Sequence, residues 1–226
     1  MVYILFIVIA LVSFAVQRTL QNKFEQYSKI PIPYGLTGRD IAERMLQENG
    51  INDVTVTQVD GHLTDHYNPS NHTVNLSKAV YYGNSVAAAA VAAHECGHAV
   101  QHARAYSFLK MRSALVPFVS FASNWVQWIL LIGILTIQVY PAIMFLGIIL
   151  FAATTLFSFI TLPVEINASQ RALAWLNNAG VTDVTTHDKA KDALKWAAYT
   201  YVVAALGSLA TLVYYILIFV GGRRND

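Results

Sequence analysis

The stretch Ser113–Val164, SALVPFVSFASNWVQWILLIGILTIQVYPAIMFLGIILFAATTLFSFITLPV, decides the fold class because it contains no Asp, Glu, Lys, Arg or His. As a single helix it would be about 78 Å long, more than twice the roughly 30 Å hydrocarbon core of a bilayer. The stretch must therefore cross a membrane twice. The best break is Thr136–Pro141, which predicts a transmembrane hairpin over 113–163, with spans 113–135 and 141–163.

The composition of the whole chain agrees with a membrane protein. Of its 226 residues, 55% are hydrophobic and 12% charged, whereas soluble domains carry about a quarter charged residues. Two further apolar segments predict an N-terminal transmembrane anchor at 1–16 and a C-terminal transmembrane helix at 197–220. The first segment lacks the basic start of a signal peptide, since Arg18 follows it, so we expect it to remain uncleaved.

Four spans place residues 17–112 and 164–196 on the same side of the membrane. These segments hold all of the 15 Lys and Arg residues except Arg223 and Arg224. The positive-inside rule then predicts a multi-pass protein of the cell membrane with both segments in the cytoplasm. The net charge is only +2 and no basic face emerges, so we expect no nucleic-acid partner.

The segment between the first two spans has the pattern of a small α+β domain. Thr37 can cap a helix that runs through Leu46. The alternating run Val54–Val59 predicts a strand, and Thr73–Leu76 predicts another short one. Ser85 can then cap a helix that begins with an alanine-rich run.

That last helix contains His94-Glu95-Cys96-Gly97-His98. His98 lies one turn beyond His94 and about 40° around the axis, so both imidazoles can reach one metal ion. Glu95 lies about 100° from His94, where it can take a proton from a zinc-bound water. Gly97 is unusual in a helix interior unless another segment approaches closely there. The motif predicts half of a metalloprotease active site.

A catalytic zinc ion needs a third protein ligand. His102 lies about 12 Å along the helix from His94, which is too far for a shared ion. The other histidines have no motif around them; they are His62, His66, His72 and His187.

Glu165 is the best candidate for the third ligand. It is the first charge after the neutral stretch, in a helix expected to start just after Pro163. A carboxylate buried at a membrane boundary is costly unless it is paired or bound to metal. A salt bridge with Arg171 is the alternative.

Three segments together resemble the bacterial YugP-like family of membrane-bound neutral zinc metallopeptidases: Leu63–Tyr67, Ala93–Gln101 and Leu162–Ser169. The resemblance covers most of residues 1–220. The family is similar to the gluzincins, such as the HtpX-type and prenyl-protein-processing membrane proteases, whose third ligand is a Glu on a later helix.

The resemblance implies a zincin-like catalytic region at 17–112 and a helix at 164–196 that carries the third ligand. It implies one Zn²⁺ per chain, held by His94, His98 and Glu165, with Glu95 as the base. Many gluzincins brace a ligand histidine with an Asp at the position of Ser169. Here we expect Asn167 or Asp65 to provide the brace.

The predicted activity is therefore hydrolysis of a peptide or protein substrate close to the lipid bilayer. Thr73–Leu76 is the candidate for an edge strand that pairs with the substrate. Residues that could contact the substrate or transition state are His66, Tyr67, Asn75 and Tyr82. Two alternatives remain: a proteolytically inactive zinc-binding membrane scaffold or sensor, and a site-2-type intramembrane protease.

Overall fold

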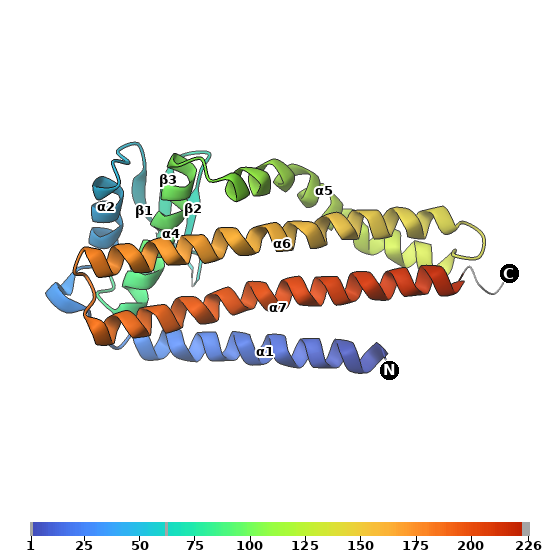
Figure 1. Ribbon diagram of the computed structural model, residues 1–226, viewed down its shortest axis with the longest axis horizontal. Coiled ribbons are helices and arrows are strands. Elements are labelled where there is room, and N and C mark those ends of the chain that lie inside the picture. Colours follow the sequence, from blue (N-terminus) through green and yellow to red (C-terminus); the bar gives the residue numbers. More distant parts are fainter. Residues whose placement is uncertain (1, 62, 223–226) are drawn as a thin grey trace. The chain divides into compact units, whose positions relative to one another are not determined.

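The computed structural model describes residues 2–61 and 63–222 of a mostly helical chain (Figure 1). His62, one of the histidines considered as a third ligand, lies outside these residues. The elements in order are α1 (Val2–Tyr27), the 3-10 turn η1 (Pro33–Gly35), α2 (Gly38–Glu48), β1 (Thr55–Val59), β2 (His66–Asn68), β3 (Thr73–Ser77), α3 (Lys78–Tyr81), α4 (Val86–Ala103), α5 (Ser107–Leu135), α6 (Pro141–Asn178) and α7 (Val184–Gly222).

Within the described residues, four helices are long and apolar enough to cross a membrane, namely α1, α5, α6 and α7. Helix α5 ends at Leu135 and α6 begins at Pro141, so the chain breaks where the sequence predicted it. Helix α1 continues to Tyr27, well past the apolar segment 1–16. The expectation of a multi-pass helical protein with a small sheet is confirmed at this level.

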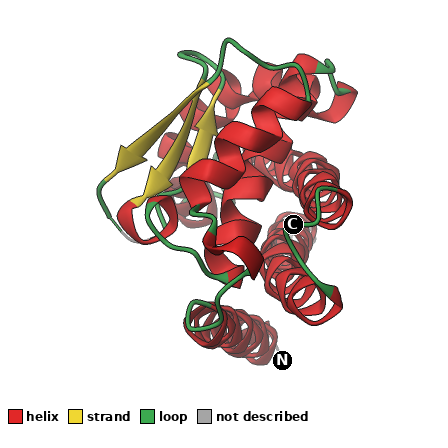
Figure 2. Ribbon diagram, turned by 90° about the vertical axis from the view of Figure 1, so that its left-hand side faces the viewer, coloured by secondary structure: helices red, strands yellow, loops and turns green. Residues whose placement is uncertain are grey.

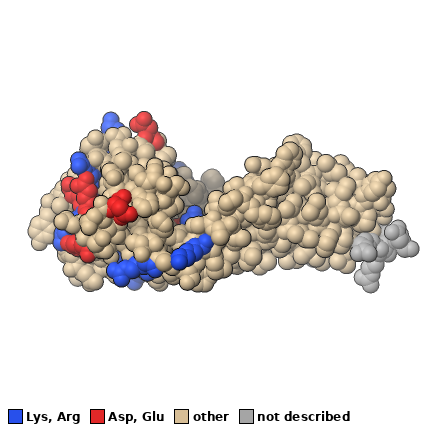
Figure 3. Space-filling view, turned by 90° about the horizontal axis from the view of Figure 1, so that it is seen from above, with Lys and Arg blue, Asp and Glu red and all other residues tan. Residues whose placement is uncertain are grey.

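The chain forms two compact units. The helical unit consists of residues 1–13, 110–162 and 201–226, and the mixed unit consists of residues 14–109 and 163–200. Within the described part of the helical unit, only Lys110 and Arg112 carry charge. Figure 3 shows the coloured, charged side chains of this face gathered over the mixed unit. A charge-free helical surface is what a hydrocarbon environment requires.

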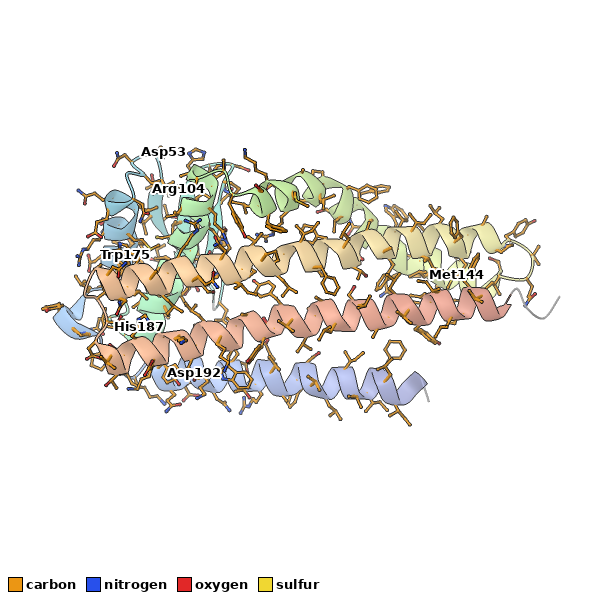
Figure 4. The ribbon with its side chains drawn as sticks, in the orientation of Figure 1. Asp53, Arg104, Met144, Trp175, His187 and Asp192 are labelled. Atoms are coloured by element: carbon orange, nitrogen blue, oxygen red, sulfur yellow. The ribbon has the colours of Figure 1, made fainter. Side chains whose placement is uncertain are left out.

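Small residues bring the helices of the helical unit together. A Cβ on Gly133 would lie 2.6 Å from Cα of Met144, so α5 and α6 meet there without a side chain between them. Met144 is fully buried (Figure 4) beside Val126, Leu130 and Ile148. Close contact of this kind replaces the hydrophobic effect as the source of helix association in lipid.

The mixed unit contains a three-stranded sheet in the order β1-β3-β2 (Figure 2). Strand β1 is parallel to β3, with Thr55 opposite Thr73, and β2 is antiparallel to β3, with Tyr67 opposite Val74. The proposal that Thr73–Leu76 forms an edge strand is therefore wrong. The chain turns back directly after β2, which places β2 on one side of β3, while β1 occupies the other side.

Helix α2 forms as its sequence predicts. The hydroxyl of Thr37 accepts from the backbone N–H of Asp40, and the Asp40 carboxylate accepts from the N–H of Thr37 at 2.8 Å. This reciprocal capping box satisfies two backbone donors at the start of the helix. One face of the helix is buried, with Ile41, Ala42, Met45 and Leu46 at most 3% exposed.

Helix α6 differs from the expectation that a helix starts after Pro163. It runs without interruption from Pro141 to Asn178, with Pro163 in its interior. Proline removes one backbone donor, but apolar helices tolerate it where neighbouring groups satisfy the freed carbonyls. Glu165 consequently belongs to the same helix as the apolar segment that precedes it.

Helix α1 is tied to α7 within the mixed unit. The hydroxyl of Tyr27 donates to Oδ2 of Asp192 at 2.6 Å, and Nζ of Lys23 lies 2.8 Å from the same oxygen (Figure 4). These contacts are partly shielded from water, and they fix the C-terminal half of α1 as a wall of the mixed unit.

Candidate metal centre

Helix α4 supplies two of the candidate ligands from the interior of the mixed unit. Ser85 caps it by accepting from the N–H of Ala88 at 3.2 Å. Its side chains from Val86 to Ala93 are all buried, because alanine lets neighbouring elements approach from every side. The helix packs against α2, α3 and β2. His94, Glu95 and His98 thus sit on a rigid, well-supported segment.

Gly97 allows the second ligand-bearing helix to approach. A Cβ at this position would lie 2.6 Å from the carbonyl oxygen of Ala168 on α6, closer than any side chain permits. Ala168 is itself fully buried. The close approach expected from the glycine is the crossing of α4 and α6, and it places Glu165, three residues before Ala168, opposite the two histidines.

The three side chains form one cluster. Potential ligand atoms of His94, His98 and Glu165 all lie within 4.8 Å of one another. Oε2 of Glu165 lies 3.3 Å from Nε2 of His94 and 3.6 Å from Nε2 of His98. The side chain of Glu165 is only 5% exposed. Two imidazoles and one carboxylate form a donor set that suits zinc, so these residues could hold a metal ion.

Neighbouring side chains orient both imidazoles. Nδ1 of His94 lies 3.1 Å from Oγ of Ser169, and Nδ1 of His98 lies 3.0 Å from Oε1 of Gln101. With Nδ1 engaged, each ring directs Nε2 towards Glu165. The amide oxygen of Gln101 can only accept, so Nδ1 of His98 donates and its Nε2 can bind a metal; the hydroxyl of Ser169 can accept from Nδ1 of His94 in the same way.

Gln101 is a contact of the cluster that the motif did not reveal. It is fully buried, and its Nε2 donates to the carbonyl of Val164 at 2.7 Å and to Oδ1 of Asn167 at 3.1 Å. It therefore connects His98 to the turn of α6 that carries Glu165. One signal was present in the sequence: Gln101 is a polar residue one helical turn after His98, just after two apolar residues.

The bracing residues differ from those expected. Ser169, which stands where many gluzincins have Asp, contacts His94 directly. Asn167 acts at one remove, through Gln101, and also accepts from Nε of Arg171 at 2.8 Å. Asp65 contributes elsewhere, because its carboxylate accepts from the backbone N–H and hydroxyl of Ser77.

The electrostatics of the cluster favour positive charge. Burial by itself would lower the pKa of His98, but the hydrogen bond with Glu165 and the negative charges of Glu95 and Glu165 raise this pKa above its ordinary value. A cation shared between the imidazoles and the carboxylate is stabilised by the same charges.

Glu95 lies beside the cluster and is held by the edge strand β2. Its Oε2 accepts from the backbone N–H of Tyr67 at 3.0 Å, and Glu95 is 8% exposed. The hydroxyl of Tyr67 lies 2.8 Å from Nδ1 of His102, one turn beyond His98. Burial raises the pKa of the Tyr67 phenol, so it remains a proton donor at neutral pH. Tyr67 therefore contacts α4 at two positions, Glu95 through its backbone N–H and His102 through its hydroxyl.

The remaining candidates make their described contacts elsewhere. Nδ1 of His66 lies 2.8 Å from the carbonyl of Thr64, and Nδ1 of His72 lies 2.8 Å from Oδ2 of Asp53. The other three are occupied as follows: His187 contacts Thr182, Asn75 accepts from Thr57 and donates to Thr73, and Tyr82 packs its ring against Tyr81. The roles of His66, Asn75 and Tyr82 in substrate binding stay predictions.

Comparison with known proteins agrees with this geometry. Residues 2–220 match the family model described as "Putative neutral zinc metallopeptidase". The chain belongs to this family. It is also 43% identical over 227 residues to the "Putative membrane protease YugP" of Bacillus subtilis (strain 168), with 100% of both chains covered. No solved structure matches the chain.

Membership of the zinc metallopeptidase family gives the cluster its chemical context. The family description names zinc and peptide hydrolysis. The chain has two histidines and one glutamate, which could hold a metal ion, at a buried helix crossing. The relative is named as a membrane protease, and the described residues of this chain include four candidate membrane spans. The resemblance expected from the three sequence segments is therefore confirmed.

Proposed function

We propose that this protein is a zinc-dependent metalloendopeptidase that hydrolyses peptide bonds at the membrane. One Zn²⁺ per chain would be held by His94, His98 and Glu165. The observation that carries the proposal is the approach of these three side chains to within 4.8 Å beside Glu95. The mixed unit would then be a zincin-like catalytic domain, with its helix, edge strand and later glutamate in the corresponding roles.

The chain's own residues would divide the chemistry as follows. A bound zinc ion would supply Lewis acidity, which polarises the scissile carbonyl and lowers the pKa of the attacking water. Glu95 would take the proton of that water on its carboxylate and later deliver it to the leaving amine. Ser169 and Gln101 would keep the two imidazoles in the tautomer that binds metal.

Strand β2 is the better candidate for pairing with the substrate. The N–H of Tyr67 points away from β3, because it donates to Glu95. In a strand, the N–H and C=O of one residue point to the same edge, so the carbonyl of Tyr67 lies on this outer edge as well. An extended peptide that donates to this carbonyl would lie beside Glu95.

The structure favours hydrolysis over the two alternative functions. The described part of the chain contributes three side chains to the cluster, which suits a catalytic site with one position left for water better than a purely structural site with four protein ligands. Helix α4 is not among the candidate spans of the described residues, and it packs against the sheet. This placement favours chemistry outside the bilayer.

The decisive test replaces Glu95 with Gln. Glu95→Gln should lose at least about 100-fold in the rate of peptide hydrolysis, because loss of a general base costs roughly 10²–10⁴-fold. Zinc content should stay near one per chain, because Glu95 is not a proposed ligand. Glu43→Gln, on the exposed side of α2, is the matched control and should keep full activity. A Glu95→Gln variant that keeps more than about 1% of the rate removes Glu95 from this role.

A further inference from the structure

The mixed unit contains a cavity that the three proposed ligands and Glu95 do not line. Its volume is about 410 Å³, within the range of small-ligand sites. Helix α1 forms one wall with Leu20, Gln21 and Phe24, and the start of α4 forms another with Ala87 and Ala88. The short side chains of α4 leave space in front of the longer ones of α1.

The cavity adjoins the strand that faces Glu95. Asp65, which also lines it, precedes Tyr67 by two residues. Two strand residues span about 6.6 Å. Because the N–H of Tyr67 contacts Glu95, the wall of the cavity at Asp65 lies about two residues along the chain from the strand position that faces Glu95.

Two carboxylates of the wall have partners within the protein. The carboxylate of Asp65 accepts from the N–H of Ser77 at 2.7 Å and from its hydroxyl at 3.1 Å. Glu25, another lining residue, pairs with Lys29 at 2.9 Å. Arg18, Gln21 and Asn22 of α1 add further polar groups, but most of the surface that lines the cavity is apolar.

We propose that this cavity is a specificity pocket for a bulky apolar side chain of the peptide substrate, located two or three residues from the scissile bond. The inference rests on the proposed peptidase function. A peptide paired with β2 would have its cleaved bond at Glu95. The peptide residues that lie alongside Asp65 would then reach the cavity. Leu20, Gln21 and Phe24 on one side and Ala87 and Ala88 on the other set the size of the side chain accepted.

The test compares variants that change the cavity in opposite directions. Gln21→Trp should fill it and Leu20→Ala should enlarge it, while Gln26→Trp, an exposed position of α1 outside the cavity, is the matched control. Full-length protein with zinc would be profiled on a peptide library by mass spectrometry. We expect Gln21→Trp to lower kcat/KM about 10-fold for peptides with Phe or Leu at the second or third residue from the cleaved bond. Leu20→Ala should raise the preference for Trp there.

Peptide binding gives a second readout that does not need hydrolysis. In a Glu95→Gln background, fluorescence anisotropy should show the same ranking of affinities for Phe- and Trp-containing peptides. Failure of the wild-type protein to cleave any peptide would count against the proposed function, whereas the binding data would still judge the pocket. Unchanged preferences in both assays would overturn the pocket. So would a change confined to the residues flanking the cleaved bond, or a change only in the dependence of activity on added lipid.

Discussion

Gln101 shows how a single buried side chain can couple two ligand-bearing helices. Its amide oxygen contacts Nδ1 of His98, and its amide nitrogen donates to the carbonyl of Val164, next to Glu165. Both ends of the amide are used inside a site that excludes water. Removing it takes away the added hydrogen bond to that carbonyl and leaves an imidazole without an orienting partner.

Gln101→Leu, which keeps the volume and removes the polar atoms, should therefore weaken zinc binding about 10- to 100-fold. Affinity can be measured by competition with a chelator of known zinc affinity. Gln26→Leu, at an exposed position of α1, should leave the affinity unchanged. An affinity of Gln101→Leu within about twofold of the wild type would show that Gln101 serves packing alone.

Glu165 and His102 offer a direct comparison of two candidate third ligands. Glu165 lies at the cluster, whereas His102 contacts the hydroxyl of Tyr67. Glu165→Ala should lose bound zinc and hydrolysis together, and His102→Ala should keep its metal, as measured by elemental analysis of purified protein. Zinc retained by Glu165→Ala and lost by His102→Ala would exclude the proposed ligand set.

At the level of elements, the sequence predicts those features that depend only on residues close together in the chain. The capping residues Thr37 and Ser85, the buried face of α2 and the break after Leu135 follow from nearest-neighbour chemistry. The strand order does not, because β2 is only three residues long and its place beside β3 depends on tertiary packing. The course of α6 through Pro163 also depends on neighbours that satisfy the backbone.

The candidate site divides in the same way. His94, Glu95 and His98 follow from helical periodicity, and Glu165 stands out because charge is rare around it. The contacts of Ser169 and Gln101 with the imidazoles depend on how α4 and α6 cross. No one-dimensional pattern specifies that crossing, although Gly97 indicated that something approaches there.

The capping box of α2 makes a pH-dependent contribution to stability. Hydrogen bonds from the side chain and backbone of Thr37 hold the pKa of Asp40 below its ordinary value. This contribution is present above the ordinary carboxyl pKa of about 4, and it is lost as the pH falls through the lower folded-state value. Asp40→Ala should cost on the order of 1 kcal/mol at neutral pH.

The deficit of Asp40→Ala relative to the wild type should shrink as the pH is lowered from about 5 to 3. The difference in thermal unfolding midpoint between Asp40→Ala and the wild type, measured in detergent at each pH, reports this deficit. Glu43→Ala, which removes an exposed ion pair with Arg39 on the same helix, should cost no more than about 0.5 kcal/mol at any pH. A deficit for Asp40→Ala that grows in acid would contradict the role of the ionised carboxylate.

At the level of the whole molecule, the distribution of Lys and Arg predicts that the mixed unit faces the cytoplasm. The single cysteine makes this testable, because Cys96 is fully buried and burial raises the pKa of its thiol. A buried thiol with little thiolate reacts slowly. The wild-type chain should therefore give no background signal with a thiol reagent.

Asn52→Cys, at an exposed position before β1, should resist an impermeant thiol reagent in intact cells and react after lysis. The wild-type chain, with Cys96 alone, is the control and should stay unlabelled in both conditions. Labelling of Asn52→Cys in intact cells would place the metal cluster on the outer face.

The contact of Gly97 with Ala168 also limits when the proposed zinc site can form during synthesis. Two proposed ligands leave the ribosome with α4, but the third follows only after α5 and most of α6 have been made. A nascent chain in which this hairpin has not yet been made holds two imidazoles and no carboxylate, and two ligands do not make a catalytic zinc site. The proposed zinc site would therefore form only after the apolar hairpin has been synthesised, and a chain truncated before α6 would lack it.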